Sequence, residues 1–169
     1  MEQEEATGGF EKRFVRSLDE HFERLHARSH ELIEVLTAEQ LYRQPRQAAS
    51  AFPTRSCGEY LLRSAAAVEQ SFGGITANLW DDPFEWTLPE SLATPALVAE
   101  YLNEVEATRR RGFTLLTADG DLLKEIALPS GEMQTLGALL LETLVRAAHY
   151  QGCAFASFRL FSDQRLPQV

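Results

Sequence analysis

The sequence contains few of the residues that mark secreted, metal-binding or nucleic-acid-binding chains. It has two cysteines, Cys57 and Cys153, which are too few for a disulfide framework and lack a metal-ligand spacing. Its 25 acidic and 16 basic side chains give a net charge of −9, which disfavours nucleic acid and anionic membranes as partners. No apolar run approaches the ~18 residues of a membrane-spanning helix, and the acidic first residues are unlike a signal peptide. We therefore expect a cytoplasmic protein.

Lysine is the scarcest charged residue. Only Lys12 and Lys124 are present, so arginine supplies almost all of the positive charge. This bias reflects either genomic composition or buried ion pairs, which arginine forms better than lysine. The length of 169 residues and the hydrophobic content of 44% suit a single domain, residues 1–169, with one sizeable core.

Prolines are absent from four long windows, and in each window the apolar residues recur at helical spacing. Ser56 followed by Glu59 is typical of a capping box, and Thr94 followed by Pro95 is typical of a helix start. The sequence therefore predicts an all-α fold with four helices over about 10–44, 56–80, 95–117 and 132–161.

The sequence also predicts the surroundings of two single residues and of one long connection. Phe14 falls on the apolar stripe of the first helix, which predicts that it faces the core. Gly152 falls inside the last helix, where glycine costs ~1 kcal/mol relative to alanine, so we expect another helix or backbone segment close to it. The connection over 81–91 carries Phe84 and Trp86 and is expected to fold over one end of the helices.

Two histidines have a spacing that metal sites use. His26 and His30 are four residues apart, so both imidazoles could reach one ion on a helix. Their angular positions point them to the flank or to solvent, which favours ordinary surface histidines. A metal site would need a third ligand from another helix.

Nucleophilic catalysis has one candidate, Cys57. It begins the second predicted helix, where the helix dipole and the nearby Arg55 and Arg63 could lower the pKa of its thiol. The alternative is a small packing residue at a helix start. The sequence contains no nucleophile elbow, phosphate-binding glycine loop or His-Glu-x-x-His motif.

The last predicted helix has the most unusual polar cluster. Glu142, Arg146 and Tyr150 follow each other at intervals of four, so they share a face, and that face adjoins the apolar seam. One interpretation is an ion pair between Glu142 and Arg146, with the Tyr150 ring packed inward. The other is a small pocket between helices, lined by Arg146, Tyr150 and a polar group from another helix.

The order of these features over about residues 10–161 resembles the DinB/YfiT-like superfamily. The resemblance lies on the capping-box helix, the long aromatic loop, and a last helix with the segments Thr135-Leu136-Gly137-Ala138-Leu139-Leu140-Leu141 and His149-Tyr150-Gln151-Gly152 followed by Arg159. It implies a four-helix bundle with up-down-down-up topology that forms a homodimer. The family is described as metal-dependent hydrolases, and some relatives are thiol-dependent transferases or isomerases.

The resemblance also implies where a metal would bind. The family holds a divalent ion such as zinc or nickel with three histidines. A gapless comparison, anchored on Glu69 and Gly152, places Ser64, Arg146 and Tyr150 at those three positions, and His149 at that of a histidine that is not a ligand. A hydroxyl is a poor ligand and arginine stays protonated, so we expect a degenerate metal site and no metal cofactor.

Three functional hypotheses follow. In the first, Arg146 replaces the positive charge of the metal and binds a small acidic ligand, with Ser64, Tyr150 and the nearby His149 and Glu142 completing a polar pocket. In the second, the protein is a hydrolase or transferase of the DinB/YfiT kind that uses Cys57, or zinc or nickel held in another way. In the third, the pocket is closed and the chain is a scaffold whose aromatic loop contacts a partner.

Overall fold

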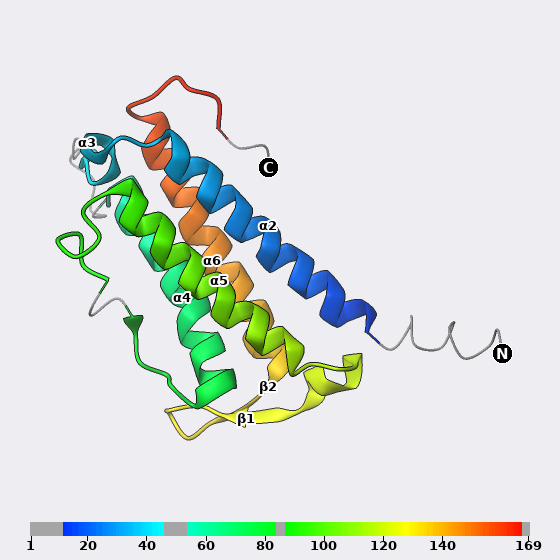
Figure 1. Cartoon of the computed structure of the whole chain (residues 1–169). Coiled ribbons are helices and arrows are strands. Elements are labelled where there is room, and N and C mark those ends of the chain that lie inside the picture. Colours follow the sequence, from blue (N-terminus) through cyan, green and yellow to red (C-terminus); the bar gives the residue numbers. More distant parts are fainter. Residues whose placement is uncertain (1–11, 46–53, 84–86, 167–169) are drawn as a thin grey trace, which may run out of the picture.

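The computed structural model describes residues 12–45, 54–83 and 87–166, and it is mostly helical, which confirms the all-α prediction. Its long helices are α2 (Arg13–Val35), α4 (Cys57–Ala77), α5 (Pro95–Thr114) and α6 (Leu136–Arg159). They lie side by side, and α4 and α5 run in one direction while α2 and α6 run in the other (Figure 1). α5 and α6 each contact both α2 and α4. None of the described helices combines the length and apolar composition needed to cross a membrane.

The first predicted helix is divided in two. α2 ends at Val35, Leu36 is extended, and α3 (Ala38–Leu41) follows. Thr37 starts α3 through a capping box, because its hydroxyl accepts from the Gln40 amide (3.2 Å) and the Gln40 side chain accepts from the Thr37 amide (3.1 Å). The prediction of one continuous helix is therefore wrong. Residues 10 and 11 lie outside the described residues.

The other predicted helix starts and ends are largely correct. Ser56 and Glu59 form the expected capping box of α4, and Thr94 caps α5 with Pro95 at its first position. α4 ends before residue 80 because Asn78 adopts a left-handed conformation with φ 54°.

The connection before α6 is more ordered than predicted. A short 3₁₀ helix, η2 (Asp119–Leu123), precedes a hairpin of β1 (Glu125–Ala127) and β2 (Met133–Thr135). The strands are antiparallel, and Gly131 turns between them with φ 85°. α6 consequently begins at Leu136 rather than at residue 132, with Thr135 as its cap. Three-residue strands are too short to give a periodic sequence signal.

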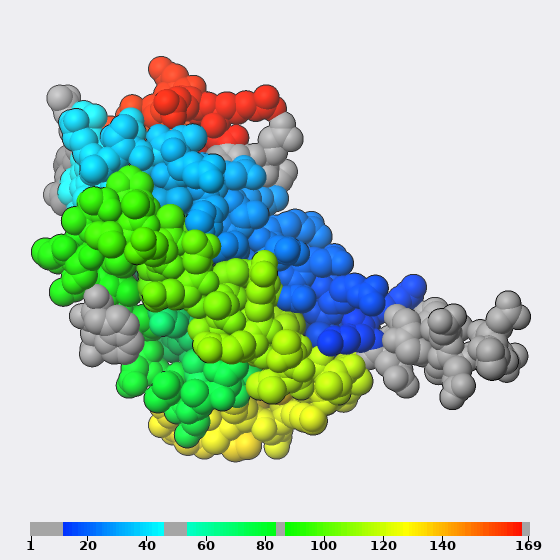
Figure 2. All heavy atoms as spheres, viewed as in Figure 1, coloured from blue at the N-terminus to red at the C-terminus, as the bar shows by residue number. Residues whose placement is uncertain are grey.

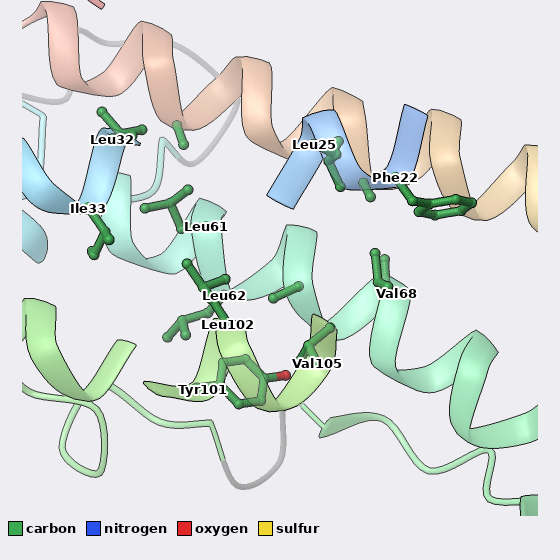
Figure 3. Packing of buried hydrophobic residues seen from close by; sticks show 14 of the residues in the cluster. Phe22, Leu25, Leu32, Ile33, Leu61, Leu62, Val68, Tyr101, Leu102 and Val105 are labelled. Atoms are coloured by element: carbon green, nitrogen blue, oxygen red, sulfur yellow. The ribbon is translucent and has the colours of Figure 1, made fainter. Parts of the chain in front are cut away.

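Buried apolar side chains from all four long helices form one core, part of which is shown in Figure 3. Phe22, Phe72 and Phe113 are in mutual contact, with ring centroids 5.3–5.8 Å apart. Phe14 was expected in this core but is 71% exposed. Val15 faces inward instead, and its amide donates to Asp119 Oδ1 (2.9 Å) in η2.

The outer surface over α2 and α5 is continuous, with α3 at one end and the hairpin at the other (Figure 2).

The loop over 81–91 is described in part, and Phe84 and Trp86, which were expected at one end of the helices, lie outside the described residues. Thr87 is buried and donates to the Pro83 carbonyl from both its amide (3.0 Å) and its hydroxyl (2.9 Å).

Gly152 has no close neighbour, contrary to the prediction of a tight helix crossing. It is exposed in the middle of α6, and a Cβ atom added there would meet nothing within 4 Å. We therefore expect Gly152→Ala to raise the free energy of unfolding by about 0.5–1 kcal/mol, because alanine has the higher helix propensity. Urea unfolding followed by circular dichroism measures this change. A destabilised variant would mean that another chain or segment covers this face.

Candidate functional site

The register of α6 decides which predicted site residues face inward. Ala147 and Gln151 are 0% and 4% exposed, and the Gln151 amide nitrogen donates to Leu25 O (2.6 Å) and Ser29 Oγ (2.7 Å) on α2. Arg146 and Tyr150 each precede one of these residues and are therefore rotated by about 100° around the helix axis, toward its flank.

The structure does not bring the predicted trio together, because Ser64 lines a different cavity from Arg146 and Tyr150. Ser64 is 1% exposed, and its hydroxyl donates to the Ala147 carbonyl (2.8 Å). It lines a small cavity of about 20 Å³ together with Ser29 and His26. That space is large enough for about one water molecule.

Arg146 and Tyr150 instead line a surface depression between α4 and α6, which we call the α4–α6 groove. It consists of two adjoining cavities that share Gln70 and Arg146. The larger has a volume of about 320 Å³ and extends past Glu142 to the hairpin turn. The smaller, of about 70 Å³, contains Tyr150. The groove thus brings together Glu142, Arg146 and Tyr150 from the predicted set.

Arg146 makes two hydrogen bonds, both long and both to neutral oxygens. Its Nη2 donates to Ala67 O (3.4 Å) and to Gln70 Oε1 (3.3 Å) on α4. The predicted ion pair with Glu142 is wrong, because within the described part of the chain these two side chains form no ion pair within 4.0 Å. A guanidinium has five N–H donors, so most of those on Arg146 remain available to a ligand.

Gln70 of α4 and Trp80, which follows α4, complete the wall on the α4 side, and neither was predicted from the sequence. The Gln70 amide nitrogen donates to the Trp80 carbonyl (3.0 Å), which fixes the side chain with its oxygen toward Arg146. The Trp80 ring lies against Gly74, where an added Cβ would be 2.5 Å from a ring carbon, and its indole donates to Asn78 Oδ1 (3.0 Å). These contacts hold an aromatic surface at the groove.

Two small hydroxyl side chains form the groove floor. Ser71 and Thr143 are buried and 2.6 Å apart. Thr143 donates to the Leu139 carbonyl (2.7 Å), so Ser71 donates to Thr143. Both hydroxyl groups of the floor therefore donate their hydrogen bonds within the protein. The polar groups that can form new hydrogen bonds with a ligand are those on the walls.

Neither His149 nor Cys57 is among the residues that line the two cavities of the groove, although the His149 ring lies 5.7 Å from that of Tyr150. His149 is exposed, with its Nε2 3.8 Å from Cys153 Sγ. Cys57 is 1% exposed, and burial raises the pKa of its thiol to about 12. Of the two alternatives for Cys57, these values favour a packing residue over an activated thiol, because desolvation of the thiolate opposes the helix dipole.

His26 and His30 do lie together, with ring centroids 4.7 Å apart. His30 Nε2 is 3.0 Å from Asn103 Oδ1, and burial lowers the pKa of His26. Across residues 12–45, 54–83 and 87–166, no three or more His, Cys, Asp or Glu side chains gather as a metal site would require.

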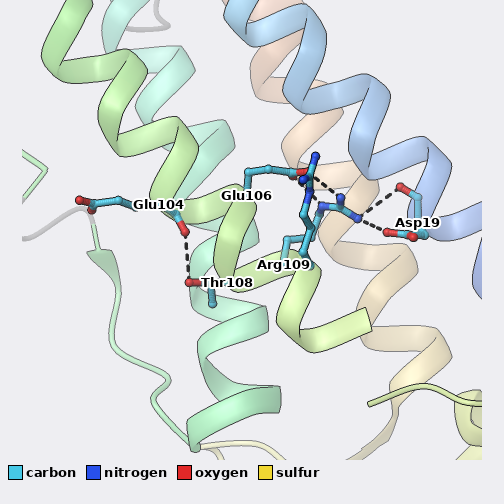
Figure 4. A network of polar contacts seen from close by, with 6 residues as sticks. Asp19, Glu104, Glu106, Thr108 and Arg109 are labelled. Carbon is cyan, nitrogen blue, oxygen red and sulfur yellow. Dashed lines mark hydrogen bonds and ion pairs between the residues drawn. The ribbon is translucent and has the colours of Figure 1, made fainter. Parts of the chain in front are cut away.

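One arginine forms buried ion pairs, which were one of the two explanations given for the excess of arginine over lysine. Arg109, at 3% exposure, donates to both carboxylate oxygens of Glu106 (2.7 Å each) and contacts Asp19 of α2 (Figure 4). Arg110 donates to the same Glu106 carboxylate (2.7 Å). Since every charge in this cluster has an opposite partner, it ties α5 to α2 and is a structural element.

The resemblance to the DinB/YfiT-like superfamily rests on the order of sequence features described above. Comparisons of the chain with family models, with curated proteins and with solved structures find no match.

Proposed function

We propose that this protein is a non-catalytic binding module for a small acidic ligand, which occupies the α4–α6 groove. The observation that carries the proposal is Arg146, a cation at the junction of two cavities whose hydrogen bonds are long and go to neutral oxygens. A carboxylate or phosphate would give it shorter, charge-assisted and bidentate bonds.

The dimensions and lining of the groove support this proposal. A volume of about 320 Å³ lies within the range of small-molecule sites, and a few polar groups converge on it from three directions. Arg146 comes from α6, Gln70 from α4, and Ser130 and Gln134 from the hairpin. Tyr150 adds a polar group at the smaller cavity.

We further propose that the fold is a four-helix bundle of the DinB/YfiT-like kind with a degenerate metal site. The opposed directions of α2 and α6 relative to α4 and α5 support this topology. Near Ser64 the inward positions of α6 hold Ala147 and Gln151. A hydroxyl, a methyl and an amide make a poor ligand set for a divalent ion. The alternative, a hydrolase or transferase with zinc or nickel, predicts near-stoichiometric metal in protein purified without chelators.

Substitution of Arg146 tests the proposed function. We expect titration calorimetry with a panel of small carboxylates and inorganic phosphate to detect binding, and Arg146→Gln to weaken it about 10- to 100-fold, as expected for a lost hydrogen bond to a charged group. Arg24→Gln is the control, because Arg24 is an exposed arginine on α2, paired with Glu20. Equal affinities of Arg146→Gln and the wild type, or no binding of any probe, would refute the proposal.

A further inference from the structure

The α4–α6 groove carries two opposite charges from one helix that do not neutralise each other. Glu142 and Arg146 are four residues apart on α6, the spacing and order at which such side chains normally pair. Here both line the larger cavity without forming an ion pair. Glu142 has no hydrogen bond or ion pair with any other described residue.

The separation has a visible cause on the arginine side. Gln70 holds Arg146 toward α4, and Gln70 is itself held by the carbonyl of Trp80. Arg146 and Glu142 consequently present a cation and an anion to the same cavity. A ligand with one negative and one positive group can pair with both, whereas a dicarboxylate would place its second charge against Glu142.

The larger cavity also has an apolar part to its lining, beside the polar groups described above. Leu128 and Pro129 lie on the hairpin side, Leu139 lies at the base, and the Trp80 ring is fixed against Gly74. An aromatic residue and three aliphatic ones in the lining of one cavity suit an apolar or aromatic substituent. The charged groups would then orient the ligand, and the apolar surface would hold its side chain.

We propose, on the basis of the proposed function, that the groove selects a zwitterionic ligand of the amino-acid type with an apolar side chain. Its carboxylate pairs with Arg146, its ammonium group pairs with Glu142, and its side chain lies against Trp80. Selectivity for a zwitterion over a simple carboxylate therefore depends on Glu142.

The test compares amino acids with their analogues that lack the ammonium group. Titration calorimetry would use phenylalanine and leucine together with 3-phenylpropionate and 4-methylpentanoate. We expect at least one amino acid to bind about tenfold or more tightly than its deaminated analogue. Glu142→Gln should remove this preference without weakening the binding of the carboxylates. The control is Glu100→Gln, an exposed glutamate on α5, which should keep the preference.

The outcomes separate the two proposals. If the deaminated carboxylates bind as tightly as the amino acids, or if Glu142→Gln keeps the preference, the zwitterion proposal is wrong and the acidic-ligand proposal stands. If neither these four compounds nor any carboxylate or phosphate of the wider panel binds, both proposals are wrong. Glu142 is exposed, so its substitution leaves the core intact, and urea unfolding of the variant checks this.

Discussion

Replacing Glu106 with alanine is expected to lower the free energy of unfolding by about 3–5 kcal/mol, because it leaves a buried guanidinium without its bidentate partner. Arg109 is 3% exposed and Glu106 is 7% exposed, so the guanidinium left behind remains largely shielded from bulk water. Asp19 can compensate only in part, because it contacts a different nitrogen, Nη1. Urea unfolding measures the effect.

Two companion variants distinguish lost charge pairing from lost volume. The double variant Glu106→Leu with Arg109→Met removes both charges and keeps most of the apolar volume, so we expect it to be more stable than Glu106→Ala alone. Arg110→Ala should cost less than about 1 kcal/mol, because the Arg110 side chain is 65% exposed although it also contacts Glu106. If the double variant were as unstable as Glu106→Ala, the charge explanation would be incorrect.

The pH dependence of the same variant provides an independent check. Burial by itself would raise the pKa of Glu106, but hydrogen bonds from Arg109 and Arg110 outweigh it, so the folded-state pKa lies below the usual value for a glutamate. A depressed carboxylate pKa contributes stability above the unfolded-state value, and this contribution is lost as the pH falls through the folded-state value. We therefore expect the stability difference between wild type and Glu106→Ala to shrink below about pH 4.5.

The helices could be predicted because their signals are local. Apolar periodicity and the caps at Ser56 and Thr94 are encoded within a few residues, and the structure places α4 and α5 accordingly. The break before α3 also has a local signal, which is the capping pair Thr37 and Gln40. This signal was overlooked because the apolar periodicity continues on both sides of the break. The hairpin had no comparable signal, because the pairing of three-residue strands depends on the surrounding tertiary structure.

The site was predicted only in part because neighbouring residues on a helix point about 100° apart, so sequence spacing alone defines the inward positions poorly. Arg146 and Tyr150 line the groove, whereas the buried positions next to them on α6 are Ala147 and Gln151. Ser64 is buried and donates to the Ala147 carbonyl, so the structure does not bring it together with Arg146 and Tyr150. Gln70 was missed because its role depends on the Trp80 carbonyl, a backbone group that the sequence pattern does not reveal.

The largest packing effect is expected at Phe72, which is 0% exposed and contacts the rings of Phe22 and Phe113. Phe72→Ala should lower the free energy of unfolding by about 3–5 kcal/mol, since it removes buried apolar surface and leaves a cavity. Gly112 on α5 shows how tightly this ring is enclosed, because a Cβ added there would be 2.4 Å from Phe72 Cδ1. We therefore expect Gly112→Ala to destabilise the wild-type protein by about 1–3 kcal/mol through overpacking.

The two substitutions should couple, and the coupling can change the sign of one effect. In the Phe72→Ala background the obstructing ring is absent, so Gly112→Ala should be neutral or stabilising by about 1 kcal/mol through its helix propensity and partial filling of the cavity. A double-mutant cycle measured by urea unfolding tests this expectation. Additive losses would contradict this expectation. They would mean that the backbone around Gly112, and not the Phe72 ring, resists the added methyl group, so that Gly112 of α5 and the Phe72 ring of α4 are not in close contact.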